Sequence, residues 1–174
     1  WPNCIDPDVF YDEDGRMWMV YGSWSGGIFL LEIDKTTGLV IHPEADKANN
    51  VDPYYGKRLL GGGHISIEGP YIMYDETSGY YYLFVSYGSL KSDYNSRVGR
   101  SRSICGPFID FHGKDLIADE DEDNSTGLLA MCGYQWNEGQ AYMGPGHNSV
   151  LHDVNGRWYL VCHIRRKNFT QQEE

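Results

Sequence analysis

One short pattern occurs three times along the chain, and each copy begins with a different polar residue. The copies cover residues 6–20, 68–85 and 147–162. Each consists of an apolar strand, an aspartate followed three or four residues later by glycine, and a second apolar strand, which is typical of a β-hairpin. The first residues are Asp6, Glu68 and His147, which precede the turn aspartates of their copies by six, seven and six residues. We therefore expect these three residues, here called the repeat heads, to be structurally equivalent.

The composition favours sheet over helix. The chain contains 14 Tyr, 5 Trp and 6 Phe, and many of them stand in the candidate strands, where aromatic residues are favoured. No stretch of a dozen residues shows a convincing helical period. Further strands are expected over 27–33, 39–41 and 96–101, so units of antiparallel strands follow one another, as in a β-propeller. A β-sandwich is the competing architecture, but it gives no reason for polar residues to recur at one position.

The spacing of the repeat heads predicts an incomplete propeller. The heads are 62 and 79 residues apart, more than the roughly 40–50 residues of a bare blade, and we assign the excess to loops over 35–61 and 109–140. Residues 1–174 then form one partial propeller domain of about three blades, with units starting near residues 3, 64 and 143. Because propellers close with about 4–8 blades, apolar faces and strand edges would stay uncovered. We expect a complementary polypeptide or self-association to complete the ring.

Charge and cysteine content exclude several function classes. The formal net charge of −11 argues against a nucleic-acid partner. Much of the excess lies over 115–123, which indicates an exposed acidic loop, with a calcium loop as the alternative. The four cysteines are widely separated, so neither a zinc site nor a disulfide framework is evident. No signal peptide and no apolar membrane span is present, so we expect no membrane partner.

Two acids at converging repeat heads suit acid–base catalysis. Ile5 and Ile67 place apolar side chains beside Asp6 and Glu68, and such surroundings can keep one carboxyl protonated while the other stays ionised. Glycoside hydrolysis is the reaction that most often needs such a pair. Taken singly, an aspartate before proline is usually a turn residue and a glutamate before Gly-Pro a surface residue. Their recurrence at the repeat heads favours a site.

Four segments of the chain resemble the endo-α-1,5-L-arabinanases of glycoside hydrolase family 43. They are Asn3–Pro7, Gly22–Ile28, Ile67–Pro70 and Pro145–Ser149, and the resemblance extends in order through nearly the whole chain. That family folds as a five-bladed β-propeller and hydrolyses arabinan with inversion of configuration. The resemblance therefore implies a glycoside hydrolase that acts on α-1,5-linked L-arabinan or arabino-oligosaccharides. A polysaccharide substrate favours an extracellular or secreted protein.

The resemblance also implies a role for each candidate residue. Glu68 matches the general acid, and Asp6 matches the aspartate that orients and tunes this acid. His147 matches a histidine at a metal in the propeller channel, usually calcium; because calcium prefers oxygen ligands, we expect a single bond from His147 within a shell of water. Asn3 and Ser23 match positions near the bound sugar.

The general base of the family is an aspartate well upstream of the position of Asp6. Only five residues precede Asp6, so we expect the base to come from outside this segment. Asp8 is no substitute, because it lies one pleat deeper along the same strand. Two alternatives stay open: a non-catalytic carbohydrate-binding or assembly module, and a related family 43 xylosidase or arabinofuranosidase.

Overall fold

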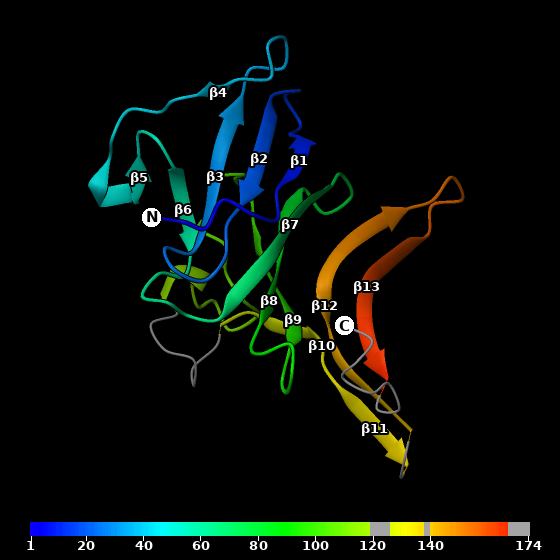
Figure 1. Cartoon of the computed structure of the whole chain (residues 1–174). Coiled ribbons are helices and arrows are strands. Elements are labelled where there is room, and N and C mark those ends of the chain that lie inside the picture. Colours follow the sequence, from blue (N-terminus) through cyan, green and yellow to red (C-terminus); the bar gives the residue numbers. More distant parts are fainter. Residues whose placement is uncertain (119–125, 138–139, 167–174) are drawn as a thin grey trace.

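The computed structural model describes residues 1–118, 126–137 and 140–166, so residues 119–123 of the acidic run fall outside it. The described chain is all-β, with three antiparallel sheets and two single-turn 3₁₀ helices, η1 (Lys47–Asn49) and η2 (Leu116–Ala118) (Figure 1). This confirms the predicted fold class and the low helix content. None of the described helices is long and apolar enough to cross a membrane.

The first sheet has the strand order β1-β2-β3-β6-β5, with the short β4 paired to β3. Its strands are β1 (Asp8–Tyr11), β2 (Met17–Tyr21), β3 (Ile28–Ile33), β4 (Val40–Ile41), β5 (Val51–Asp52) and β6 (Gly56–Leu60). β5 and β6 come from the segment that we assigned to a loop, so that part of the prediction is wrong. They were missed because β6 has no alternation of its own and is held by pairing with β3, a strand more than twenty residues away.

The second sheet has the strand order β10-β9-β8-β7, and the third has the order β11-β12-β13. The strands of the second sheet are β7 (Ile67–Asp75), β8 (Tyr80–Tyr87), β9 (Asn95–Ser101) and β10 (Leu128–Met131). Those of the third are β11 (Tyr134–Asn137), β12 (Gln140–His152) and β13 (Trp158–Arg166). β10 and β11 lie within the second predicted loop, which is therefore also corrected.

All three predicted hairpins are present, as β1–β2, β7–β8 and β12–β13. Their turns are closed by the expected aspartates, whose side chains accept hydrogen bonds from backbone N–H groups inside the turn, an arrangement that aspartate favours. In the first hairpin Asp12 Oδ1 accepts from Asp14 and Arg16 at 3.0 and 2.9 Å. Asp153 repeats this pattern in the third hairpin, with Asn155 and Arg157, both at 2.9 Å.

The main hydrophobic core lies between the first and second sheets. Burying these apolar side chains supplies the main driving force for packing the two sheets together. Apolar side chains of β2, β3 and β6 pack there against those of β7 and β8; the fully buried members include Val20, Ile28, Leu30, Leu60, Ile67, Ile72, Tyr81, Leu83 and Val85.

The strands that follow the repeat heads meet along the middle of the molecule. β7 contacts β1 on one side and β12 on the other, and the three sheets spread away from this line in Figure 1. This is the arrangement of blades in a β-propeller, and the ring is not closed. The third sheet accordingly leaves large apolar side chains exposed, among them Leu151, Trp158, Tyr159, Val161 and Ile164.

Candidate active site

Two of the repeat heads, and the residue that follows the third, share an unusual backbone conformation. Asp6, Gly69 and His147 have positive φ values of 55°, 58° and 46°, a left-handed conformation that is uncommon for residues other than glycine. Each of the three precedes its turn aspartate by six residues. The residue equivalent to Asp6 and His147 is therefore Gly69, and our assignment of Glu68 to that position is wrong by one residue.

The three left-handed residues contact one another. The Gly69 N–H donates to Asp6 Oδ2 at 3.2 Å, and His147 Nε2 lies 4.0 Å from Asp6 Oδ1. A Cβ atom on Gly69 would lie 3.0 Å from Cγ of the His147 ring, so glycine is what allows this close approach. The repeat heads thus converge as predicted, and Glu68 is held directly beside this centre by its bonded neighbour. We call Asp6, Glu68, Gly69 and His147 the head cluster.

The Glu68 carboxyl is held by a tyrosine from the turn before β9. The Tyr94 hydroxyl donates to Glu68 Oε1 at 2.5 Å. Burial raises the pKa of Tyr94, and the hydrogen bond to Glu68 raises it further, so the phenol keeps its proton throughout the neutral range. The His163 ring stacks on Tyr94, with centroids 5.6 Å apart and planes 12° apart. Burial lowers the pKa of His163, and the nearby His147 acts in the same direction.

The two predicted sugar-binding residues lie together. Asn3 Nδ2 donates to Ser23 Oγ at 3.0 Å, and Ser25 Oγ donates to Asn3 Oδ1 at 3.3 Å. The N-terminal segment is held on the loop between β2 and β3, because Gly22 N–H donates to the Ile5 carbonyl at 3.0 Å. A Cβ on Gly26 would come within 2.7 Å of the Trp1 backbone, so this packing also needs a glycine.

The same loop carries an exposed aromatic side chain. Trp24 is half-exposed, and its ring lies 4.7 Å from that of His64, just before β7. The Trp24 N–H donates to the Ile67 carbonyl at 2.7 Å, so the backbone of Trp24 lies beside the residue that precedes Glu68. An indole in this position is suited to stacking against a sugar ring.

Asp8 serves to join two sheets. Its Oδ2 accepts a hydrogen bond from the Ile72 N–H of β7 at 3.1 Å. Burial raises the pKa of Asp8, and the bond from Ile72 opposes that shift. Its carboxyl is thus engaged between β1 and β7, as expected for a residue that joins two sheets.

The donor atoms of the head cluster suit a weakly held cation only. Calcium takes six to eight oxygen ligands, whereas among the described residues no group of three or more His, Cys, Asp or Glu side chains could hold a metal. The His147 side chain is 44% exposed, so its imidazole can reach a hydrated ion. The residues fit an ion bound through one imidazole and surrounded by water, and they do not fit a protein cage. None of the four cysteines forms a disulfide within the described residues.

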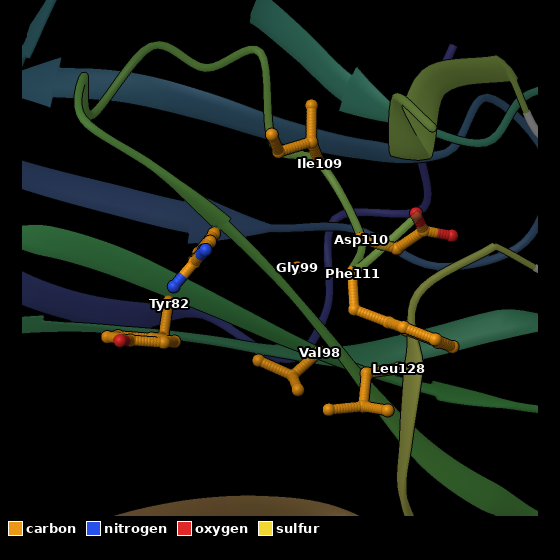
Figure 2. Close-up of a pocket in the computed structure, with 8 residues that line it drawn as sticks. Tyr82, Val98, Gly99, Ile109, Asp110, Phe111 and Leu128 are labelled. Carbon is orange, nitrogen blue, oxygen red and sulfur yellow. The ribbon is translucent and has the colours of Figure 1, made fainter. Parts of the chain in front are cut away.

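The head cluster is separate from the cavity drawn in Figure 2. That cavity, of about 260 Å³, lies between β9 and the segment Ile109–Phe111, and its other lining side chains include Tyr82, Val98 and Leu128. None of its lining residues belongs to the head cluster. The two acids and the imidazole lie instead where β7 meets β1 and β12.

Sequence reasoning missed four residues that support the head cluster. They are Ser86, Tyr94, Asn148 and His163. Ser86 Oγ accepts from the His147 N–H at 2.7 Å, and Asn148 Oδ1 accepts from Ser96 Oγ at 2.6 Å. A polar Asn148 within a strand, directly after a repeat head, was the one available signal. Ser86, Tyr94 and His163 stand in no motif, and only the fold brings them to the site.

Comparison with known proteins identifies the family. Residues 1–174 match the glycosyl hydrolases family 43. The chain is 41% identical over 180 residues to the extracellular endo-α-(1→5)-L-arabinanase 2 of Bacillus subtilis, covering 94% of this chain and 36% of that protein. It is 31% identical over 168 residues to the extracellular exo-α-(1→5)-L-arabinofuranosidase of Cellvibrio japonicus, covering 92% of this chain and 44% of that protein.

A solved structure agrees with this assignment. The crystal structure of endo-1,5-α-L-arabinanase from Thermotoga petrophila superposes with a TM-score of 0.83 at 38% identity, covering 96% of this chain and 38% of that one. The chain thus spans less than half the length of each relative named here. Fold, head cluster and both comparisons lead to one conclusion: the chain belongs to glycoside hydrolase family 43.

Proposed function

We propose that this chain forms part of a glycoside hydrolase that cleaves α-1,5-linked L-arabinan. The observation that carries the proposal is the bond from Gly69 N–H to Asp6 Oδ2. It holds one carboxylate beside Glu68, so two acids are kept together at the meeting point of three sheets. The relatives named above as arabinanases support this substrate, and no observation favours a non-catalytic module.

In this mechanism Glu68 is the general acid. It protonates the glycosidic oxygen as the bond to the departing sugar breaks, which general acid catalysis accelerates by roughly 10²–10⁴-fold. Asp6 orients this acid. Its side chain is mostly buried, and its two oxygens face Gly69 N–H and His147 Nε2, so its position is fixed from two strands.

The base and the stereochemistry are further parts of the proposal. A carboxylate from outside the 174 residues activates a water molecule on the opposite face of the sugar, and the reaction inverts the anomeric configuration. Such a base stands about 6.5–9.5 Å from the acid, because the attacking water must fit between them. The remaining blades come from the same polypeptide or from a partner, and they cover the exposed apolar side chains of the third sheet. The family relatives named above are extracellular, which supports an extracellular site of action.

His147 and the polar pair supply binding. We propose that His147 holds a calcium ion through one bond in a largely hydrated shell. A cation there adds positive charge beside two carboxylates. Asn3 and Ser23 are proposed to bind sugar hydroxyls, and Trp24 to stack on a sugar ring.

The test compares Glu68→Gln with Glu76→Gln, an exposed glutamate in the turn of the same hairpin. The protein is assayed with linear arabinan and with xylan, and the anomer released first is read by NMR. We expect Glu68→Gln to lower arabinan turnover by roughly 10²–10⁴-fold while sugar binding persists, and Glu76→Gln to leave turnover unchanged. Wild-type protein that binds arabinan and never cleaves it, in the presence of its remaining blades, would contradict the proposal; preferential cleavage of xylan would overturn the substrate.

A further inference from the structure

We propose that Tyr94 is a positioning residue for the general acid. It is the last donor in a buried hydrogen-bond chain that starts at the His147 N–H and reaches the Glu68 carboxyl. This inference rests on the proposed function, because it assigns a role relative to Glu68. The chain runs from the His147 N–H to Ser86 Oγ at 2.7 Å, from the Ser86 hydroxyl to the Tyr94 oxygen, and from the Tyr94 hydroxyl to Glu68 Oε1 at 2.5 Å.

The Tyr94 ring is held in a narrow slot formed by the third sheet. A Cβ on Gly146 would lie 2.3 Å from Cε1 of this ring, and one on Gly144 would lie 3.5 Å from its Cβ. The His163 ring of β13 stacks on Tyr94. Because β12 and β13 hold the ring at these points, the hydroxyl has a fixed position relative to β7, where Glu68 begins the second hairpin.

Burial of Tyr94 and Ser86 fixes the arrangement of the hydrogen-bond chain. Tyr94 is 1% exposed and Ser86 is 0% exposed, so water cannot replace either hydroxyl without a change in packing. A buried polar group that loses its partner keeps the full cost of desolvation. The side chain of Glu68 is therefore confined to the rotamer that reaches Tyr94.

The direction of the hydrogen bond from Tyr94 gives the two carboxyl oxygens of Glu68 different roles. A phenol has one hydrogen to donate, and here it points at Glu68 Oε1. Oε1 is thus occupied by this hydrogen bond, and in the proposed mechanism Oε2 is the oxygen that delivers the proton to the glycosidic oxygen. After the transfer, the bond to Oε1 stabilises the carboxylate that forms, since hydrogen bonds to charged groups are the stronger ones.

The experiment measures Tyr94→Phe in the active protein with two substrates. On arabino-oligosaccharides, which need protonation of the leaving oxygen, we expect kcat to fall roughly 10–100-fold with KM changed less than about twofold. On an aryl arabinoside with an acidic phenol, which leaves without protonation, we expect a fall of less than about threefold. Replacing a residue that is needed only for folding would lower the rates on both substrates by the same factor.

Tyr21→Phe is the matched control. Tyr21 is also buried, and its hydroxyl donates to the Tyr55 carbonyl at 2.9 Å, in the first sheet. This variant should leave both rates unchanged.

Ser86→Ala removes the middle link of the hydrogen-bond chain. It should lower kcat on the arabino-oligosaccharides more than kcat on the aryl arabinoside, as Tyr94→Phe does, but by a smaller factor. If Tyr94→Phe does not fold, this variant provides the test.

The outcomes separate this inference from the proposed function. Unchanged rates for Tyr94→Phe, or equal losses on both substrates, overturn the role of Tyr94 while Glu68→Gln still reports a general acid. If the wild-type protein with all its blades hydrolyses neither substrate, the proposed function fails together with the inference drawn from it.

Discussion

Gly69 offers the most direct test of the head cluster, through the variant Gly69→Ala. Two costs follow from its surroundings. A non-glycine residue in the left-handed conformation costs about 1–2 kcal/mol, and the φ of Gly69 is 58°. The added Cβ would also lie 3.0 Å from His147 Cγ and 3.2 Å from its Cα, and crowding of this kind costs about 1–3 kcal/mol. We expect the variant to lose about 2–5 kcal/mol of unfolding free energy.

The matched control is Gly156→Ala. Gly156 has a φ of 78° in the turn of the third hairpin, and no atom lies within 4 Å of a Cβ built on it. It should lose only the conformational part, about 1–2 kcal/mol. The difference between the two variants isolates the contact between Gly69 and the His147 ring.

Urea denaturation, followed by tryptophan fluorescence, measures both variants, and an arabinan assay accompanies it. Gly69→Ala should also lose activity, because moving the backbone disturbs the N–H that holds Asp6 Oδ2; Gly156→Ala should not. Equal destabilisation of the two variants, with activity retained in both, would refute the packing of Asp6, Gly69 and His147 described above.

Two further predictions concern pH and metal. Burial raises the pKa of Asp12, but hydrogen bonds from the Trp18 ring N–H and the Arg16 N–H, together with the Arg16 charge, outweigh it and hold the pKa below its usual range. The stabilisation by Asp12 is therefore present above about pH 4 and is lost as the pH falls through the pKa of Asp12 in the folded state. In urea titrations at a series of pH values, Asp12→Asn should make the unfolding free energy less dependent on pH in the acid range. An unchanged pH dependence would contradict this role of Asp12. If His147 holds the proposed calcium ion, His147→Ala should lower the metal content and the activity with little change in far-UV circular dichroism. Wild-type protein without stoichiometric metal by elemental analysis would exclude the site.

Local features of the sequence were sufficient to identify the hairpins and the two acids. The turn at Asp12 is stabilised by its own neighbours, Asp14 and Arg16, so the pattern of a few residues predicts it. The same holds for the turn at Asp153. The resemblance to family 43 likewise rests on contiguous segments, and for that reason it pointed to Glu68 and Asp6 as candidate catalytic acids before any contact was known.

Counting along the chain did not settle which residue of the second repeat is the structural equivalent. The count of seven for Glu68, against six for the other heads, indicated Gly69, but the residue types drew attention to the acid. The shared positive φ and the contact with His147 decide in favour of Gly69. Strands β6 and β10 were missed for a related reason: they are held by pairing with β3 and β9, which lie more than twenty residues away, and they carry weak patterns of their own.

Only the tertiary structure decided what surrounds Glu68. Tyr94 is 26 residues away in the sequence, and it reaches Oε1 because Gly146 and His163, from a different sheet, hold its ring in place. No local period or motif encodes that contact, since it depends on how the second and third sheets pack. The sequence by itself therefore determined the hairpins and the all-β class and nominated the two acids, because neighbouring residues carry these patterns. The packing of separate sheets determined the head cluster and the hydrogen-bond chain, because these depend on contacts between residues far apart in the chain.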